Sequence, residues 1–134
     1  MSTSTTASAR FTGIAPGLPV PDVRRAAEFY RDHLGFVIED HADHFAWLDR
    51  DGLKLMLWRG QSRGSMSQRD ANPGISDVGI WVDDVDLAHA EFTRNRLEVV
   101  EQPEDMPYGL RHAMYRDLND YIILTSGPVR GDAG

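Results

Sequence analysis

The spacing of apolar residues along the chain alternates between two periods, which predicts helices and strands in a repeated order. Residues 23–34 carry apolar side chains three and four positions apart, and this helical spacing ends at Gly35. Residues 85–95 show the same period after Asp83 or Asp84, either of which is a good N-cap. Segments of period two, separated by turn residues, predict short strands. We expect strands over residues 11–20, 36–39, 44–49, 53–58, 77–82, 97–101, 111–116 and 121–125.

One stretch of the sequence occurs twice, which indicates one supersecondary unit used twice. Each half reads as a strand, a helix and three strands, so we expect an α+β fold of two βαβββ modules. The repeat pairs Val20, Asp22, Val23, Ala26, Glu28, Phe29, Arg31 and Leu34 with Val82, Asp84, Val85, Ala88, Glu91, Phe92, Arg94 and Leu97. The expected organisation is a flexible leader (1–10), a single domain (11–127) with a first module (11–59), a linker (60–74) and a second module (75–127), and a tail (128–134).

Alternation along the predicted strands separates side chains that pack under a helix from side chains that face away from it. Leu53, Leu55 and Leu57 suit the helix side of one sheet, and Val78, Ile80 and Val82 suit that of the other. The opposite faces are then free to line a concave site, in which aromatic rings stack on planar ligands and attract cations. The alternative is that the tryptophans fill the core or an interface between chains. The candidate residues are Phe45, Trp47, Met56, Trp58, Asp77, Trp81 and, from a later loop, Tyr108.

Composition narrows the classes of function. The chain has 134 residues, of which 41% are hydrophobic, so a folded core is expected. It has no cysteine, which excludes disulfides, thiolate metal sites and cysteine nucleophiles. A net charge of −7 argues against nucleic acid as a partner and suits a neutral or cationic small molecule, or simply keeps the protein soluble. No apolar run is long enough for a membrane span, and we expect a cytoplasmic protein.

Two pairs of motifs carry a resemblance to a known family. The segments Pro19-Val-Pro-Asp-Val and Glu28-Phe-Tyr-Arg-Asp-His-Leu-Gly-Phe36 resemble the opening of the glyoxalase/bleomycin-resistance/dioxygenase superfamily, which has the vicinal-oxygen-chelate fold. The segments that begin at Phe45 and at Pro107-Tyr-Gly-Leu-Arg-His resemble its bleomycin-resistance branch. The resemblance covers about residues 12–127. It implies two βαβββ modules and a homodimer that shares two equivalent clefts between its chains.

The sequence departs from the metal-dependent members of that superfamily, which predicts that no metal cofactor is bound. The four positions that hold a metal in the metal-dependent members correspond here to Ala15, Met56, Asp77 and Leu124. Three of these side chains cannot bind a divalent ion, which argues against glyoxalase and dioxygenase activity. A relocated metal site that uses His44, His112 and Asp77 remains an alternative.

The function that the resemblance implies is stoichiometric capture of a bleomycin-type or other planar aromatic or cationic antibiotic, with resistance conferred by sequestration. The five aromatic candidates would stack against the ligand, Asp77 would supply charge, and Met56 and Leu124 would form an apolar floor. His112 occupies a position where the resistance branch often has a glutamate, and it could contact a polar edge of the ligand. One alternative is an enzyme on the same fold, either a metal-free isomerase, cyclase or lyase or one with a rearranged metal site. Another is a non-catalytic sensor or partner protein.

Overall fold

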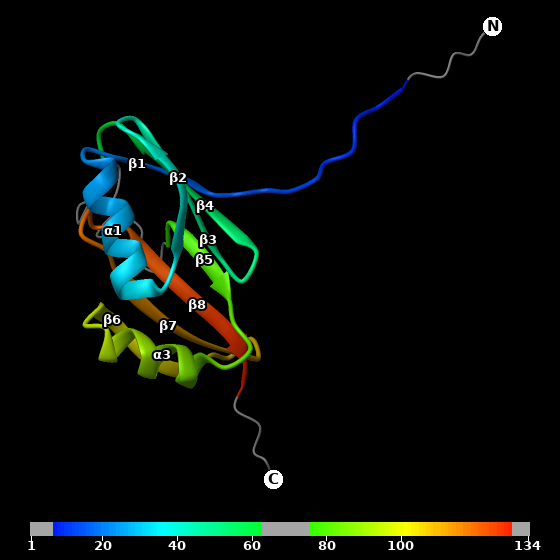
Figure 1. Ribbon diagram of the computed structural model, residues 1–134. Coiled ribbons are helices and arrows are strands. Elements are labelled where there is room, and N and C mark those ends of the chain that lie inside the picture. Colours follow the sequence, from blue (N-terminus) through cyan, green and yellow to red (C-terminus); the bar gives the residue numbers. More distant parts are fainter. Residues whose placement is uncertain (1–6, 63–75, 130–134) are drawn as a thin grey trace, which may run out of the picture.

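The computed structural model describes residues 7–62 and 76–129, which form two similar halves of four strands and one helix each (Figure 1). The first module contains β1 (Gly17–Val20), α1 (Val23–Leu34), β2 (Val37–Ala42), β3 (Phe45–Arg50) and β4 (Leu53–Arg59). The second module contains β5 (Val78–Trp81), α3 (Val85–Arg94), β6 (Glu98–Asp105), β7 (Leu110–Arg116) and β8 (Ile122–Pro128). The expected α+β fold of two βαβββ modules is therefore confirmed.

Each module is built around one four-stranded sheet. The strand orders are β1-β4-β3-β2 and β5-β8-β7-β6, so the two sheets have the same topology. The first strand of each module runs parallel to the last, and the other neighbours are antiparallel. In each module the helix connects the first strand to the far edge of the sheet and packs on one of its faces. The two equivalent sheets explain the repeat in the sequence.

Local capping interactions set the ends of both helices. The Asp22 carboxylate accepts a hydrogen bond from the Arg25 N–H (3.0 Å), and Gly35 ends α1 in the left-handed conformation at φ 75°. In the second module the Asp84 carboxylate accepts from the Leu87 N–H (3.0 Å), so Asp84 rather than Asp83 is the N-cap of α3. These bounds agree with the helices expected from the sequence.

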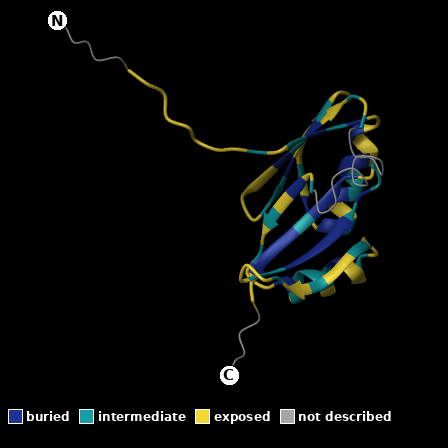
Figure 2. Ribbon diagram, turned by 180° about the vertical axis from the view of Figure 1, so that it is seen from behind, coloured by how far each residue is buried: buried dark blue, intermediate teal, exposed yellow. Residues whose placement is uncertain are grey.

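The helix sides of both sheets share one hydrophobic core, so the two modules pack against each other (Figure 2). Tyr30, Tyr115 and Tyr121 are its largest fully buried side chains. Their hydroxyls find partners, as buried phenols require: Tyr30 donates to Asp117 Oδ2 in the other module, and Tyr121 donates to the Pro19 carbonyl oxygen. Polar contacts thus fix the two modules to each other.

A partly buried ion pair adds a second contact between the modules. Arg50 at the end of β3 forms a bidentate pair with Glu91 on α3, with nitrogen–oxygen distances of 2.7 and 2.9 Å. The same guanidinium donates to the Leu34 carbonyl oxygen at the end of α1. The Arg50 hydrogen bonds lower the pKa of Glu91, so this carboxylate stays ionised across the neutral range.

Several expected strand bounds are wrong. The strand expected over 11–20 begins only at Gly17, where its register with Met56 on β4 starts, and the preceding Pro16 has no N–H to donate to the ladder. Residues 7–16 instead run away from the sheets, and Phe11 and Ile14 are 97% exposed. The strand expected over 36–39 extends to Ala42. The strand expected over 97–101 is β6 and extends to Asp105, because two bulges accommodate Pro103 within it.

Leu53 is also placed differently from expectation. The alternation assigned it to the helix side of β4, but it is 60% exposed at the very start of the strand, directly after the Asp51–Gly52 turn. Leu55 and Leu57, further along β4, are buried as expected.

Parts of the expected domain organisation lie outside the described residues. These are most of the leader (1–6), most of the linker (63–74) and most of the tail (130–134). Within the segments that the structure describes, no helix has the length and apolar character needed to cross a bilayer.

Candidate functional site

The face of the first sheet that points away from α1 carries a cluster of aromatic side chains. Phe45 lies opposite Trp58 in the β3–β4 register, and Trp47 lies opposite Met56. Trp47 and Trp58 are 36% and 43% exposed, whereas the alternating neighbours Ala46, Leu48 and Leu57 are buried in the core. We call these four residues the first open face. The expected assignment of these side chains to one face agrees with the structure.

A glycine makes room for this cluster. Gly17 on β1 pairs with Met56, and a Cβ atom at Gly17 would lie 3.0 Å from Trp58 Nε1 and 3.4 Å from Met56 Cε. The Trp58 indole and the Met56 side chain therefore lie directly over the backbone of β1. A larger residue at position 17 would push the indole out of this place.

The corresponding face of the second sheet carries fewer aromatic rings and more polar groups. Trp81 is 70% exposed and pairs with Ser126 on β8, and Gly79 pairs with Leu124. By the alternation along β7, His112 and Met114 belong to this face, opposite Ser126 and Leu124. Met114 was not predicted from the sequence, although the same alternation starting from His112 would have found it. We call Trp81, His112, Met114, Leu124 and Ser126 the second open face.

His112 lies at the centre of a chain of polar contacts on the second open face. Its Nε2 is 3.0 Å from Glu101 Oε1 on β6, and its Nδ1 is 3.2 Å from the Tyr108 hydroxyl oxygen. The imidazole side chain is only 7% exposed, while the Glu101 side chain is 45% exposed. Glu101 was not among the residues predicted from the sequence, because its distance from His112 depends on the bulged register between β6 and β7.

Tyr108 lies in a tight turn between β6 and β7 rather than in a long loop. The Gly109 N–H donates to the Met106 carbonyl oxygen (3.0 Å), and the Met106 N–H donates to the Leu110 carbonyl oxygen (2.7 Å). Pro107 presets the first turn residue and Gly109 adopts φ 89°, a region that favours glycine. The turn leaves the Tyr108 ring 63% exposed while its hydroxyl contacts His112.

Asp77 makes a contact that sequence reasoning did not anticipate. Its Oδ2 accepts a hydrogen bond from the Ile122 N–H (2.8 Å), and its own N–H donates to the Ile122 carbonyl oxygen (2.8 Å). The residue is exposed and immediately precedes β5. The carboxylate thus connects the start of β5 to β8. This structural contact is separate from any interaction of its charge with a ligand.

The residues that correspond to metal positions do not form a donor cluster. Met56 and Leu124 lie on the two open faces, and Ala15 lies in the segment before β1. In the described ranges no group of three or more histidine, cysteine, aspartate or glutamate side chains could hold a metal ion. His44, His112 and Asp77 are therefore not assembled into the alternative metal site within one chain.

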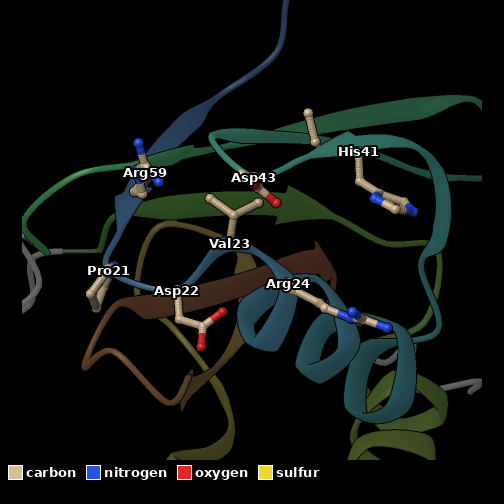
Figure 3. A pocket seen from close by; sticks show the side chains of 8 residues that line it. Pro21, Asp22, Val23, Arg24, His41, Asp43 and Arg59 are labelled. Carbon is tan, nitrogen blue, oxygen red and sulfur yellow. The ribbon is translucent and has the colours of Figure 1, made fainter.

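A pocket of about 520 Å³ lies elsewhere, between the start of α1 and the β2–β3 turn (Figure 3). In this view Arg59 from β4 and Arg24 from α1 stand at opposite sides of it. Its wall mixes both charges, and Asp22 already caps the helix. The lining residues are Pro21, Asp22, Val23, Arg24, His41, Ala42, Asp43 and Arg59, none of which was predicted as a site residue.

Known proteins share both the fold and part of the sequence. A bleomycin resistance protein from Geobacillus stearothermophilus is 36% identical over 58 residues, and the same match occurs in Staphylococcus aureus. The matched segment spans 43% of this chain and 44% of that relative, so less than half of either protein is compared.

Among solved structures, a bleomycin-binding protein from the bleomycin-producing Streptomyces verticillus, in complex with copper(II)-bleomycin, has a TM-score of 0.70 at 22% identity. The superposition covers 91% of this chain and 100% of the chain of the bleomycin-binding protein. An antibiotic-binding protein from Streptomyces sp. CB03234, TnmS3, has a TM-score of 0.69 at 23% identity, with coverage of 92% and 100%. At this identity the structures establish a common fold.

A sequence model of one family matches residues 10–123, which is most of the chain and includes both modules. The two βαβββ modules of the structure agree with this match. The chain therefore belongs to the Glyoxalase/Bleomycin resistance protein/Dioxygenase superfamily.

Proposed function

We propose that the protein binds a small aromatic molecule of the bleomycin type, or another planar antibiotic, on its open faces and protects by sequestration. One observation carries this proposal: Trp47, Trp58, Trp81 and Tyr108 are 36–70% exposed on the sides of the sheets that point away from the helices. Large rings that serve the core of this protein, such as Tyr30 and Tyr115, are at most 1% exposed. The exposed rings are thus available to a partner.

The energetics favour a ligand that covers several rings at once. An aromatic side chain buries about 150–250 Å², and covering the exposed part of one ring contributes roughly 2–4 kcal/mol at about 25 cal/mol per Å². Two or three such contacts together contribute roughly 4–12 kcal/mol, which is comparable with the loss of ligand motion, on the order of 4–15 kcal/mol, whereas a single contact is not. Met56 and Leu124 supply apolar surface between the rings. Indole faces also attract cations, which suits a planar ligand with a positive charge.

The same exposure supports a homodimer. The helix sides of the two sheets are buried against each other within one chain, so the two open faces cannot cover each other. We propose that the first open face of one chain stands across from the second open face of its partner, which gives two equivalent ligand sites. Phe11 and Ile14, both 97% exposed, offer further apolar surface for this contact. The relatives named as bleomycin resistance and bleomycin-binding proteins support the ligand class.

Thermal unfolding with and without drug tests the proposal. Metal-free bleomycin, copper(II)-bleomycin and a panel of planar natural-product antibiotics are added to the wild-type protein, because a ligand that binds only the folded state raises the Tm. We expect at least one to raise the Tm and to bind with a stoichiometry of one per chain by calorimetry. Absence of any Tm shift and of any binding heat across the panel would contradict the proposal.

A further inference from the structure

The contacts of His112 fix the direction of each hydrogen bond in its chain of partners. An ionised carboxylate can only accept, so Glu101 Oε1 requires that His112 Nε2 carries a proton. In a neutral imidazole the other nitrogen is then an acceptor, and the Tyr108 hydroxyl must donate its proton to Nδ1. This arrangement directs the Tyr108 proton inward, toward the sheet. The lone pairs of the phenol oxygen are left on the outer, exposed side.

We propose that the Glu101–His112–Tyr108 chain determines specificity: it makes the Tyr108 oxygen an acceptor that selects aromatic ligands with N–H donors, such as amidinium or protonated amino groups. The inference rests on the proposed small-molecule site and adds the hydrogen-bonding character of its ligand. Trp81, on the same open face, can stack on the aromatic part. The Tyr108 oxygen then accepts from the polar end. A cation without N–H donors gains the stacking but not the hydrogen bond.

Protonation of His112 would reverse this selection. A charged imidazole donates from both nitrogens, so Nδ1 would donate to the Tyr108 oxygen and turn the hydroxyl proton outward. The second open face would then present a donor in place of an acceptor. Other polar groups surround the ring. These are Glu101, whose carboxylate contacts Nε2, Glu104, which lies opposite His112 on β6, and Ser126, which lies opposite it on β8.

Two aromatic cations separate hydrogen bonding from charge. Benzamidinium carries N–H donors and trimethylphenylammonium carries none, yet both have one positive charge and one ring. Their affinities for the wild-type protein are measured by NMR titration. We expect benzamidinium to bind about tenfold more tightly, the effect of one charge-assisted hydrogen bond. In Tyr108→Phe, which keeps the ring, the two affinities should become equal.

Two further variants distinguish the chain from a general effect of charge. Glu101→Gln weakens the hydrogen bond that holds the proton on His112 Nε2, and it should therefore reduce the preference for benzamidinium. Glu104→Gln removes the same charge from a residue opposite His112 that makes no side-chain hydrogen bond or ion pair in the described structure, and it should leave the preference unchanged. Nitrogen-15 shifts of the ligand-free protein should show that Nδ1 of the neutral His112 imidazole is an acceptor.

The outcomes separate this inference from the proposed function. Equal affinities in the wild type, a preference that survives in Tyr108→Phe, no binding of either cation, or a proton on Nδ1 of neutral His112 would each overturn the inference. If the protein binds bleomycin but binds the two cations equally well, the proposed antibiotic binding stands and the role of the Tyr108 oxygen as a selective acceptor is refuted. If the protein prefers benzamidinium but does not bind bleomycin, the role of the Tyr108 oxygen is supported and bleomycin is refuted as the ligand.

Discussion

At the scale of single residues, Asp77 has a structural role that can be separated from its charge. Its Oδ2 accepts from the Ile122 N–H, and an asparagine amide oxygen can accept the same bond. Asp77→Asn should therefore leave the free energy of unfolding nearly unchanged, whereas Asp77→Ala should lower it by about 1 kcal/mol. Urea denaturation of the two variants measures this difference. Equal losses in both would show that the hydrogen bond contributes nothing and that charge alone matters.

Asp117 is the buried carboxyl that connects the modules, and it should give stability an unusual dependence on pH. It is 4% exposed, and burial raises its pKa although Tyr30 and the backbone N–H groups of Asn119 and Tyr121 donate to it and oppose the rise. A folded-state pKa above the unfolded one means that the folded state holds the proton more tightly. The stability from this group is thus present at low pH. It is lost as the pH rises from the ordinary aspartate range through the raised value.

The variant Asp117→Asn isolates this effect. The amide oxygen can accept from the two backbone donors, and the amide nitrogen can donate to Tyr30, so the network keeps its shape. Urea denaturation of both proteins between about pH 3 and about pH 7 gives their free energies of unfolding. We expect wild-type stability to fall relative to the variant as the pH rises. Parallel curves would show that Asp117 titrates equally in the folded and unfolded states.

At the scale of elements, the end of α1 depends on a glycine. Gly35 has φ 75°, and a Cβ atom there would lie 2.9 Å from Arg50 Nη1, which also holds Glu91 of the second module. Gly35→Ala should therefore cost about 1–3 kcal/mol of stability, through backbone strain and a displaced ion pair. Gly79→Ala is the matched control, because its backbone is ordinary and no atom lies within 4 Å of the new Cβ. Thermal unfolding that shifts equally in both variants would contradict this account.

Elements defined by local signals were predictable from the sequence, and elements defined by distant partners were not. The bounds of α1 follow from Asp22 and Gly35, whose capping contacts are within a few residues. The true start of β1 depends on its pairing with β4, about forty positions later in the chain. The extent of β6 depends on bulges that no local pattern reveals.

The candidate site shows the same division. Alternation along the strands placed Trp47, Trp58 and Trp81 away from the core, because a strand has a fixed period. It could not reveal that Glu101 holds His112, because that contact depends on the register across a bulge. Nor could it reveal that Tyr30 would reach Asp117, a residue 87 positions away.

At the scale of the whole molecule, the exposed tryptophans on both open faces predict association of two chains. We expect light scattering at micromolar concentrations to give twice the mass of the 15.0 kDa chain. Trp58→Ser with Trp81→Ser should weaken the dimer without unfolding the chain, because both rings are outside the shared core. A mass of one chain across the whole concentration range would show that the open faces do not associate, which would contradict this prediction.

The central claim is that a planar antibiotic binds on the open faces, and the indole N–H signals of the three tryptophans test it most directly. Trp47, Trp58 and Trp81 all lie on these faces and are exposed, so each reports on the proposed site. In a nitrogen-15 NMR titration with metal-free bleomycin, we expect all three indole signals to shift and to saturate at one drug per chain. If the drug bound in the pocket at the start of α1, the signals of His41 and Arg24 would shift instead. Indole signals that stay unchanged at saturating drug would contradict the account.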